Sequence, residues 1–175
     1  MTSMGKILFA KQDDVHVLKF IGDVRVTLGP TITSFLGKIR DARNLKSIII
    51  DLSESTALDS TTLGLLAKIS LQSQKILEVK PTLVSTNEDV NRILHSMGFA
   101  QIFVIVDQVM SKCDSLDELP ALSVSEYALR EQVLEAHRTL MSLNEKNKNT
   151  FCDLVDALEE EKHSEDAVFA NRRAS

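Results

Sequence analysis

The feature that most constrains the fold is a short, uninterrupted apolar run near the middle of the chain. Residues 47–52 read Ser-Ile-Ile-Ile-Asp-Leu, with three isoleucines in succession. Such a run is typical of a β-strand that is buried on both faces of a sheet. Two shorter segments of similar character follow at 82–85 and 102–106, and apolar residues recur at helical spacing between them. This alternation predicts an α/β fold, in which right-handed crossover helices join parallel strands.

The N-terminal residues predict two strands of a different kind. Residues 7–10 and 15–21 are rich in β-branched and aromatic residues, and Asp13-Asp14 between them suits a tight turn. The second strand is expected to stop at Gly22-Asp23. We therefore expect an antiparallel hairpin at the start of the chain, and a mixed β-sheet with helices packed against it.

Three helices are predicted to follow these strands. The first begins at Gly29-Pro30, because proline is favoured at the first helical position. The second is opened by residues 59–62 and carries apolar residues as far as Ile76. In the third, Thr86 or Asn87 is expected to cap the N-terminus and Gly98 the C-terminus.

Charge divides the chain into two parts. Residues 1–108 contain 12 Lys and Arg against 11 Asp and Glu, whereas residues 109–175 contain 8 against 14. The hydrophobic periodicity changes at the same place. We therefore predict a domain over 1–108, a linker over 109–122, a helical extension over 123–163 and a flexible tail over 164–175.

The predicted extension has a capping signal and an apolar stripe. Ser123-Val-Ser-Glu126 has the spacing of a capping box. A stripe of residues three or four apart follows, and it needs a cover; its members are Leu129, Val133, Ala136, Leu140 and Leu143. A polar break at 144–149 leaves a helical hairpin and one long helix both open. The cover could be the domain itself, a partner or the same helices of a second copy in a homodimer.

Composition excludes several functional classes. A net charge of −5 and a pI near 5.4 argue against a non-specific nucleic-acid binder. Apolar runs fall short of a membrane span or a signal-peptide core, so we expect a soluble cytoplasmic protein without membrane contact. Cys113 and Cys152 are isolated, and the histidines lack ligand spacing; these are His16, His95, His137 and His163. We expect no metal and no cofactor.

The segment with the most functional information lies where the buried strand ends and the second helix begins. Asp51-Leu-Ser53 ends the apolar run, and Leu58-Asp-Ser-Thr-Thr-Leu-Gly64 opens the helix. Unpaired amide groups and the helix dipole favour an anion or a hydroxyl at such a position. Asp59 or Ser60 could therefore be a simple helix cap.

The same residues resemble the signature of STAS-domain anti-anti-sigma factors, a family of bacterial partner-switching regulators. Gly22-Asp23-Val24 looks like the family's turn after the second strand, and the order of elements from Ile7 to Val106 also matches. Arg25 departs from the pattern, because the family commonly has Asp there. Thr61 and Thr62 stand where it commonly has Ser and Gly.

The resemblance implies a regulatory switch that has no catalytic activity. Ser60 corresponds to the family's phosphorylated serine, and the unphosphorylated domain binds an anti-sigma factor, often itself a serine kinase. Phosphorylation blocks this binding, and a PP2C-type phosphatase restores it. We expect the contact surface to comprise Asp23, Asp59, Thr61, Thr62 and Leu63.

Three alternatives remain at this stage. A response-regulator receiver would use Asp51 with the acidic pair Asp13-Asp14, but residues from Val15 onward form a strand where a receiver has a helix. A STAS domain that serves as an accessory or scaffold of a transporter or signalling complex would accept no phosphate at Ser60. A hydrolase would need a histidine base near Ser60, and no histidine is close in sequence.

Overall fold

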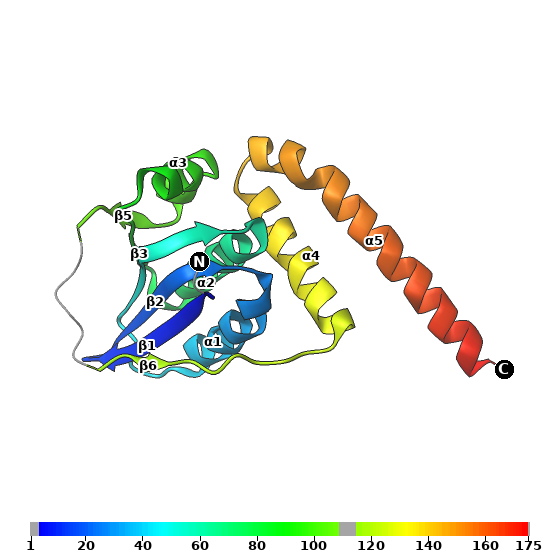
Figure 1. Ribbon diagram of the computed structural model, residues 1–175, viewed down its shortest axis with the longest axis horizontal. Helices are drawn as coiled ribbons and strands as arrows, with labels where there is room; N and C mark the ends of the chain where they lie inside the picture. Colours follow the sequence, from blue (N-terminus) through cyan, green and yellow to red (C-terminus); the bar gives the residue numbers. More distant parts are fainter. Residues whose placement is uncertain (1–3, 109–114, 175) are drawn as a thin grey trace.

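A computed structural model describes residues 4–108 and 115–174. Over these residues six strands form one mixed sheet in the order β5-β4-β3-β2-β1-β6 (Figure 1). β2 (Val15–Val24), β3 (Ser47–Leu58), β4 (Thr82–Val84) and β5 (Val104–Val106) run parallel, whereas β1 (Lys6–Gln12) pairs antiparallel with β2. The predicted α/β fold with a mixed sheet is confirmed.

The N-terminal hairpin turns at Asp13 and Asp14. Both residues have left-handed φ values, 48° and 65°, which is the geometry of a tight hairpin turn between twisted strands. Val15 pairs with Ser47 at the beginning of β3, so the turn and Asp51 lie at different levels of the sheet. This arrangement contradicts the receiver alternative, which needs the acidic pair beside the carboxyl end of that strand.

β3 is longer than the apolar run that predicts it. The strand continues from Leu52 to Leu58, beyond the apolar run, and two irregularities in its pairing with β2 accommodate the extra residues. Burial alternates along its first half, so Ile48 and Ile50 are fully buried while Ile49 is half-buried. The expectation that this strand is buried on both faces is therefore wrong.

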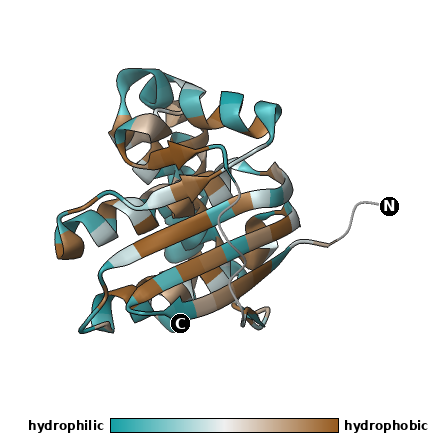
Figure 2. Cartoon of the chain, turned by 90° about the vertical axis from the view of Figure 1, so that its left-hand side faces the viewer, coloured by the Kyte–Doolittle hydropathy of each residue, from teal (hydrophilic) through white to brown (hydrophobic). Residues whose placement is uncertain are grey.

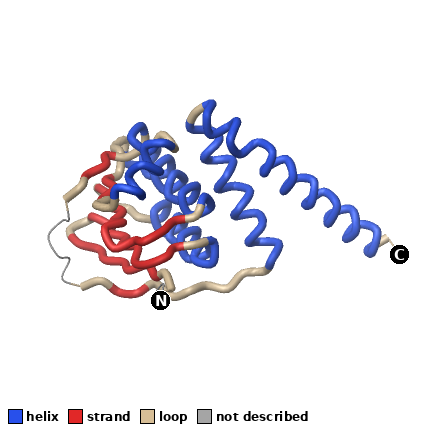
Figure 3. Tube along the Cα trace, turned by 45° about the horizontal axis from the view of Figure 1, so that its top comes forward, coloured by secondary structure: helices blue, strands red, loops and turns tan. Residues whose placement is uncertain are grey.

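One face of the sheet packs on helices, and this packing forms the core. α1 (Gly29–Asp41) and α2 (Ser60–Leu77) bury their apolar sides against the alternating inward residues of β2 and β3. Strands and helices accordingly gather on opposite sides of the molecule (Figure 3). Figure 2 shows the other face of the sheet, where hydrophobic and hydrophilic bands alternate along the strands.

The starts and ends of the helices within residues 4–108 agree with the capping and turn residues predicted from the sequence. The 3-10 helix η1 (Val26–Leu28) leads directly into α1, which has Pro30 in its first turn as predicted. Asn87 caps α3 (Glu88–Ser96) by accepting hydrogen bonds from the amides of Asp89 and Val90. Gly98 has a left-handed φ of 83° between α3 and the 3-10 helix η2 (Phe99–Gln101), as expected for a helix-terminating glycine.

The predicted linker is more ordered than expected. Residues 109–114, including Cys113, lie outside the described residues. β6 (Asp117–Glu118) then pairs with β1 at the sheet edge, and the Thr31 hydroxyl donates to the carbonyl of Pro120. Residues 121–125 are exposed and belong to neither a helix nor a strand.

The helical extension is a hairpin. α4 (Glu126–Leu143) and α5 (Glu145–Arg173) are separated by Asn144, whose backbone is extended. The cap of α4 is Ser125, which accepts from the amide of Ala128, so the capping-box prediction at Ser123 is two residues too early.

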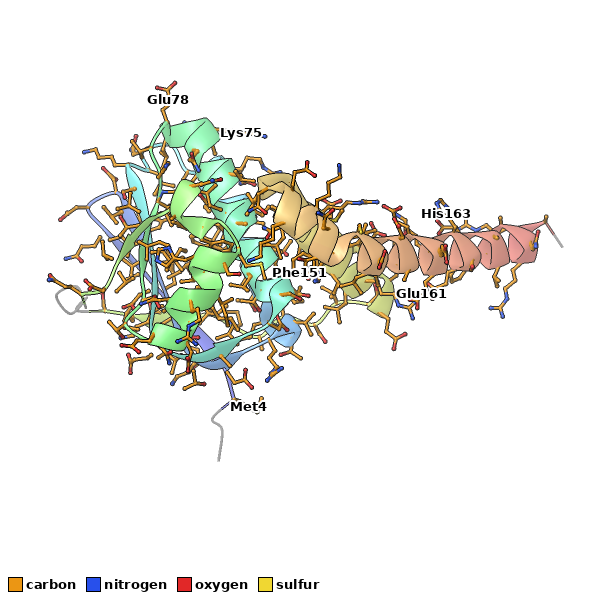
Figure 4. All side chains as sticks on the ribbon, turned by 90° about the horizontal axis from the view of Figure 1, so that it is seen from above. Met4, Lys75, Glu78, Phe151, Glu161 and His163 are labelled. Atoms are coloured by element: carbon orange, nitrogen blue, oxygen red, sulfur yellow. The ribbon has the colours of Figure 1, made fainter. Side chains whose placement is uncertain are left out.

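α5 is longer than predicted. It continues as a helix through Arg173, where a tail had been expected from residue 164. Ion pairs to α4, among them Arg130–Glu165 and Lys162–Glu131, support α5 as far as Glu165. Figure 4 shows Phe151 where α5 meets the body of the protein, whereas Glu161 and His163 lie on the part that projects away.

Candidate functional site at the start of helix α2

Asp59 fixes the position at which α2 begins. Its backbone is extended, and its Oδ1 accepts a hydrogen bond of 2.8 Å from the amide of Thr62. Its Oδ2 accepts one of 2.7 Å from the amide of Val26 in η1. A single carboxylate therefore caps α2 and ties it to the turn before α1. Since Asp59 provides the cap, Ser60 is the first helical residue and its hydroxyl is not needed for capping.

The Ser60 hydroxyl reaches a residue that lies 77 positions further along the chain. Its Oγ is 2.8 Å from Nε2 of His137 on α4. Nδ1 of the same ring is 2.7 Å from the carbonyl oxygen of Val133. Because a carbonyl can only accept, we assign the proton to Nδ1; in the neutral ring Nε2 then accepts from the serine hydroxyl.

His137 is enclosed where α4 meets the domain. Its side chain is 2% exposed, and it makes an edge contact with the Phe151 ring of α5 at 5.3 Å between centroids. Ser60 itself is half-buried. The Ser60 hydroxyl is therefore partly covered by the helical hairpin.

Asp23 lies at the end of β2, beside the start of α2. The amide of Asp59 donates to the carbonyl of Val24, which holds the two segments together. The Asp23 carboxylate accepts a hydrogen bond of 2.8 Å from Arg25, and this bond, with the negative charge behind it, raises the pKa of the exposed Arg25 guanidinium above its ordinary value. Arg25 thus offsets the acidic charge at this corner.

The other predicted contact residues face inward. The exposed fractions of Thr61, Thr62 and Leu63 are 6%, 1% and 2%. The Thr62 hydroxyl donates to the carbonyl of Val24, at 3.4 Å. These three side chains are therefore buried in this conformation, and the expectation that they belong to the contact surface stays a prediction.

A close approach of two helix backbones accompanies the Ser60–His137 contact. A Cβ atom at Gly64 of α2 would lie 2.2 Å from the carbonyl oxygen of Ala136, far inside the contact distance. Ser60 and Gly64 are four residues apart and so lie on one side of α2. His137 and Ala136 of α4 meet them there, and Figure 1 shows α4 crossing beside α2.

The Ser60–His137 pair meets one requirement of a hydrolase, because a histidine that is distant in sequence lies within hydrogen-bond reach of the serine. The rest of the arrangement does not resemble a catalytic triad, because the group that orients the ring is a backbone carbonyl and carries no negative charge. Among the described residues no group of three or more His, Cys, Asp or Glu side chains could hold a metal ion. No helix in those parts of the chain has the length and apolarity to cross a membrane.

A family model described as the STAS domain matches residues 6–112. The chain belongs to the STAS family. An anti-sigma factor antagonist from Mycobacterium paratuberculosis has a similar structure, with a TM-score of 0.54 and 21% identity over 62% of this chain and 92% of the other. A candidate antagonist from Thermotoga maritima gives a TM-score of 0.49 and 23% identity over 58% and 86%.

The family match separates the two halves of the site. Ser60, Asp59 and Asp23 belong to the STAS domain, whereas His137 and Ala136 belong to the extension that follows it. Sequence reasoning found the first group and missed the second. The stripe over residues 129–143 indicated that α4 must be covered, but no local pattern indicated that α2 covers it.

Proposed function

We propose that this STAS-family protein is a cytoplasmic anti-anti-sigma factor that works by phosphorylation-dependent partner switching. With Ser60 unphosphorylated, it binds an anti-sigma factor, or a serine kinase that acts as one, and so releases a sigma factor for transcription. Phosphorylation of Ser60 blocks this binding, and a PP2C-type phosphatase reverses it. The protein acts by binding and has no catalytic role of its own.

The observation that carries the proposal is the position of the Ser60 hydroxyl. It stands on the first residue of α2, and capping is already performed by Asp59. A phosphate there adds about −1.5 to −2 charges, which the helix N-terminus tolerates within the domain. A partner surface fitted to a neutral hydroxyl would instead meet that charge next to Asp59. A loss of about 1.4 kcal/mol reduces affinity tenfold, so the fold can stay intact while the complex dissociates.

The proposal is tested at Ser60 in protein isolated from its own cells. Phosphopeptide mass spectrometry should find phosphate on Ser60, and capture experiments should recover an anti-sigma factor with Ser60→Ala and much less with Ser60→Asp. Ser34→Asp is the matched control, because Ser34 is exposed on α1. Equal capture by both Ser60 variants, or no phosphate under any growth condition, would refute the proposed switch.

A second candidate is a STAS domain that acts as an accessory or scaffold in a transporter or signalling complex. The hydrogen bond from Ser60 to His137 favours it, because the hydroxyl then has a structural use. Under this alternative Ser60 receives no phosphate, and Ser60→Ala weakens the attachment of the hairpin without altering the capture of any regulator.

A homodimer through the C-terminal helices stays a prediction. Its original reason was the uncovered stripe on α4, but the domain and α5 bury Ala136 and Leu140 within a single chain. A dimer would need a different surface.

A further inference from the structure

α4 occupies the side of α2 on which a regulator would have to recognise Ser60. The serine hydroxyl donates to His137, and one helical turn later the Gly64 backbone touches Ala136. Ala136 and His137 are almost completely buried. A protein that approaches Ser60 from this side therefore contacts α4 before it contacts the serine.

The fit between the two helices depends on the missing side chain at Gly64. The nearest atoms to a Cβ at this position are backbone atoms of Ala136, at 2.2, 2.5 and 2.8 Å. Backbone cannot turn aside as a flexible side chain can. The docked position of α4 is thus compatible with glycine at residue 64 and incompatible with any larger residue.

The hairpin has a second attachment that depends on polar contacts. Lys146 donates to the side chain of Ser96, and Asn147 donates to the carbonyl of Met97, at 2.7 and 2.9 Å. These contacts hold the turn between α4 and α5 against the end of α3. The exposed residues 121–125 connect the hairpin to the sheet edge, and a five-residue connection spans at most about 18 Å, so a released α4 stays close to α2.

We propose that the α4–α5 hairpin is an autoinhibitory cover for Ser60. While it is docked, it occupies the Ser60 hydroxyl and the adjacent surface of α2, so that a kinase or a binding partner gains access only when the hairpin undocks. That the cover inhibits a kinase or a binding partner rests on the proposed function. That α4 covers Ser60 rests only on the contacts between α2 and α4.

Phosphorylation and docking exclude each other at this site. A phosphate on Ser60 needs space for three further oxygens next to Oγ, where Nε2 of His137 stands at 2.8 Å. The ring cannot turn freely, because its Nδ1 donates to Val133 and its edge packs on Phe151. Once Ser60 is phosphorylated, α4 cannot return to its docked position.

The apparent affinity of a partner then depends on how often the cover is open. If the binding-competent state is a small fraction of the molecules, the apparent dissociation constant rises by the inverse of that fraction. A variant that opens the hairpin permanently should expose Ser60 and bind a partner more tightly, with no change in the contact residues themselves.

The test measures the accessibility of residue 60 in the full-length protein. Ser60→Cys supplies a thiol, and the rate of its labelling by a polyethylene-glycol maleimide is followed by mass spectrometry of the peptide that contains residue 60, so that Cys113 and Cys152 do not interfere. Adding Gly64→Ala should increase this rate roughly tenfold or more, because the docked population is lost. Alanine is also a better helix former than glycine, so α2 itself is not weakened.

Gly37→Ala is the matched control. Gly37 lies within α1, and a Cβ there meets nothing nearer than the Arg40 side chain at 4.0 Å. It should leave the labelling rate unchanged. If hydrogen exchange shows that Gly64→Ala loosens α2, then Ala136→Leu places the same clash on α4 and is used in its place.

The outcomes separate the cover from the proposed function. Labelling needs neither a kinase nor an anti-sigma factor. Faster labelling with Gly64→Ala or Ala136→Leu supports the cover, even if Ser60 is never found phosphorylated and the proposed function fails. An unchanged rate in the variant that keeps α2 intact overturns the cover, whether or not partner switching is later demonstrated.

Discussion

Replacing Asp59 with alanine should destabilise the protein because one carboxylate accepts two backbone hydrogen bonds. Oδ1 accepts from Thr62, a residue that is 1% exposed, and Oδ2 accepts from Val26, which is half-buried. A buried amide left without a partner costs about 1–3 kcal/mol. Water can reach the Val26 amide more easily, so its loss costs about 1 kcal/mol. We expect Asp59→Ala to lower the free energy of unfolding by about 3 kcal/mol.

Asp59→Asn distinguishes the two hydrogen bonds. Asparagine is a good helix cap, and its amide oxygen can still accept from Thr62. Its NH2 group would face the Val26 amide, where two donors oppose each other. We therefore expect an intermediate loss of about 1–2 kcal/mol. The order of stability should be wild type, then Asp59→Asn, then Asp59→Ala.

The measurement is urea unfolding followed by circular dichroism, with the free energy obtained by linear extrapolation. Asp41→Asn is the control, since Asp41 is exposed and its ion pair with Arg40 is a surface pair at 3.7 Å. It should change the free energy by no more than about 0.5 kcal/mol. If Asp59→Ala were as stable as wild type, or if the two Asp59 variants were equal, Asp59 would not be the structural anchor described above.

Two further predictions concern a buried histidine and a buried amide. Burial and the nearby Lys11 and Lys38 lower the pKa of His16 below 6.5. Protonation therefore favours the unfolded state, and stability should fall as pH decreases below 6.5 towards the folded-state pKa. His16→Phe should flatten that decline in thermal melts between pH 7.5 and 5.5, and an identical slope in both proteins would contradict this. Asn147 donates to the carbonyls of Met97 and Leu140, each at 2.9 Å, so Asn147→Ala should cost about 2–3 kcal/mol in urea unfolding. Asn149→Ala, exposed on the same helix, should be near neutral, and equal losses for the two would refute the role of these contacts.

The parts of the fold that depend on local chemistry could be predicted from sequence. Asp13 and Asp14 indicated a hairpin because short acidic residues tolerate the left-handed backbone that the turn requires. Asn87 and Gly98 marked the ends of α3 for equally local reasons: one side chain accepts from helix amides and one residue has no Cβ. Each of these signals involves residues within about one helical turn of one another.

The parts that depend on pairing between distant segments could not be predicted. Residues 53–56 are polar and lie beyond the apolar run, yet they continue β3 because this part of the strand pairs with β2. β6 has only two residues, and the edge of β1 is what makes it a strand. The last twelve residues of the chain predict fraying, yet α5 continues through Arg173, and the ion pair of Arg130 on α4 with Glu165 supports the beginning of this segment.

The candidate site shows the same division. Asp59 and Ser60 can be predicted from their position at the start of a helix. The hydrogen bond between Ser60 and His137 joins residues 77 positions apart, and no local pattern predicts it. In the sequence Gly64 is only one residue of a motif, whereas the structure shows that its missing side chain allows the backbone of Ala136 to approach. The sequence thus indicates the residue that we propose to be modified, and the tertiary structure shows the helix that packs over it.

An intramolecular cover raises the affinity that a partner needs in order to bind the face of α2. The exposed link at 121–125 is short, and short linkers keep a tethered segment at an effective concentration in the millimolar range. A partner present at about 1 μM must therefore bind the face of α2 about a thousandfold more tightly than α4 does in order to displace it from half of the molecules. A weak contact such as the Ser60–His137 hydrogen bond can tune this competition, because each tenfold change in the balance requires about 1.4 kcal/mol. If both proposals hold, the Ser60 hydroxyl controls access through the cover as well as recognition by the partner.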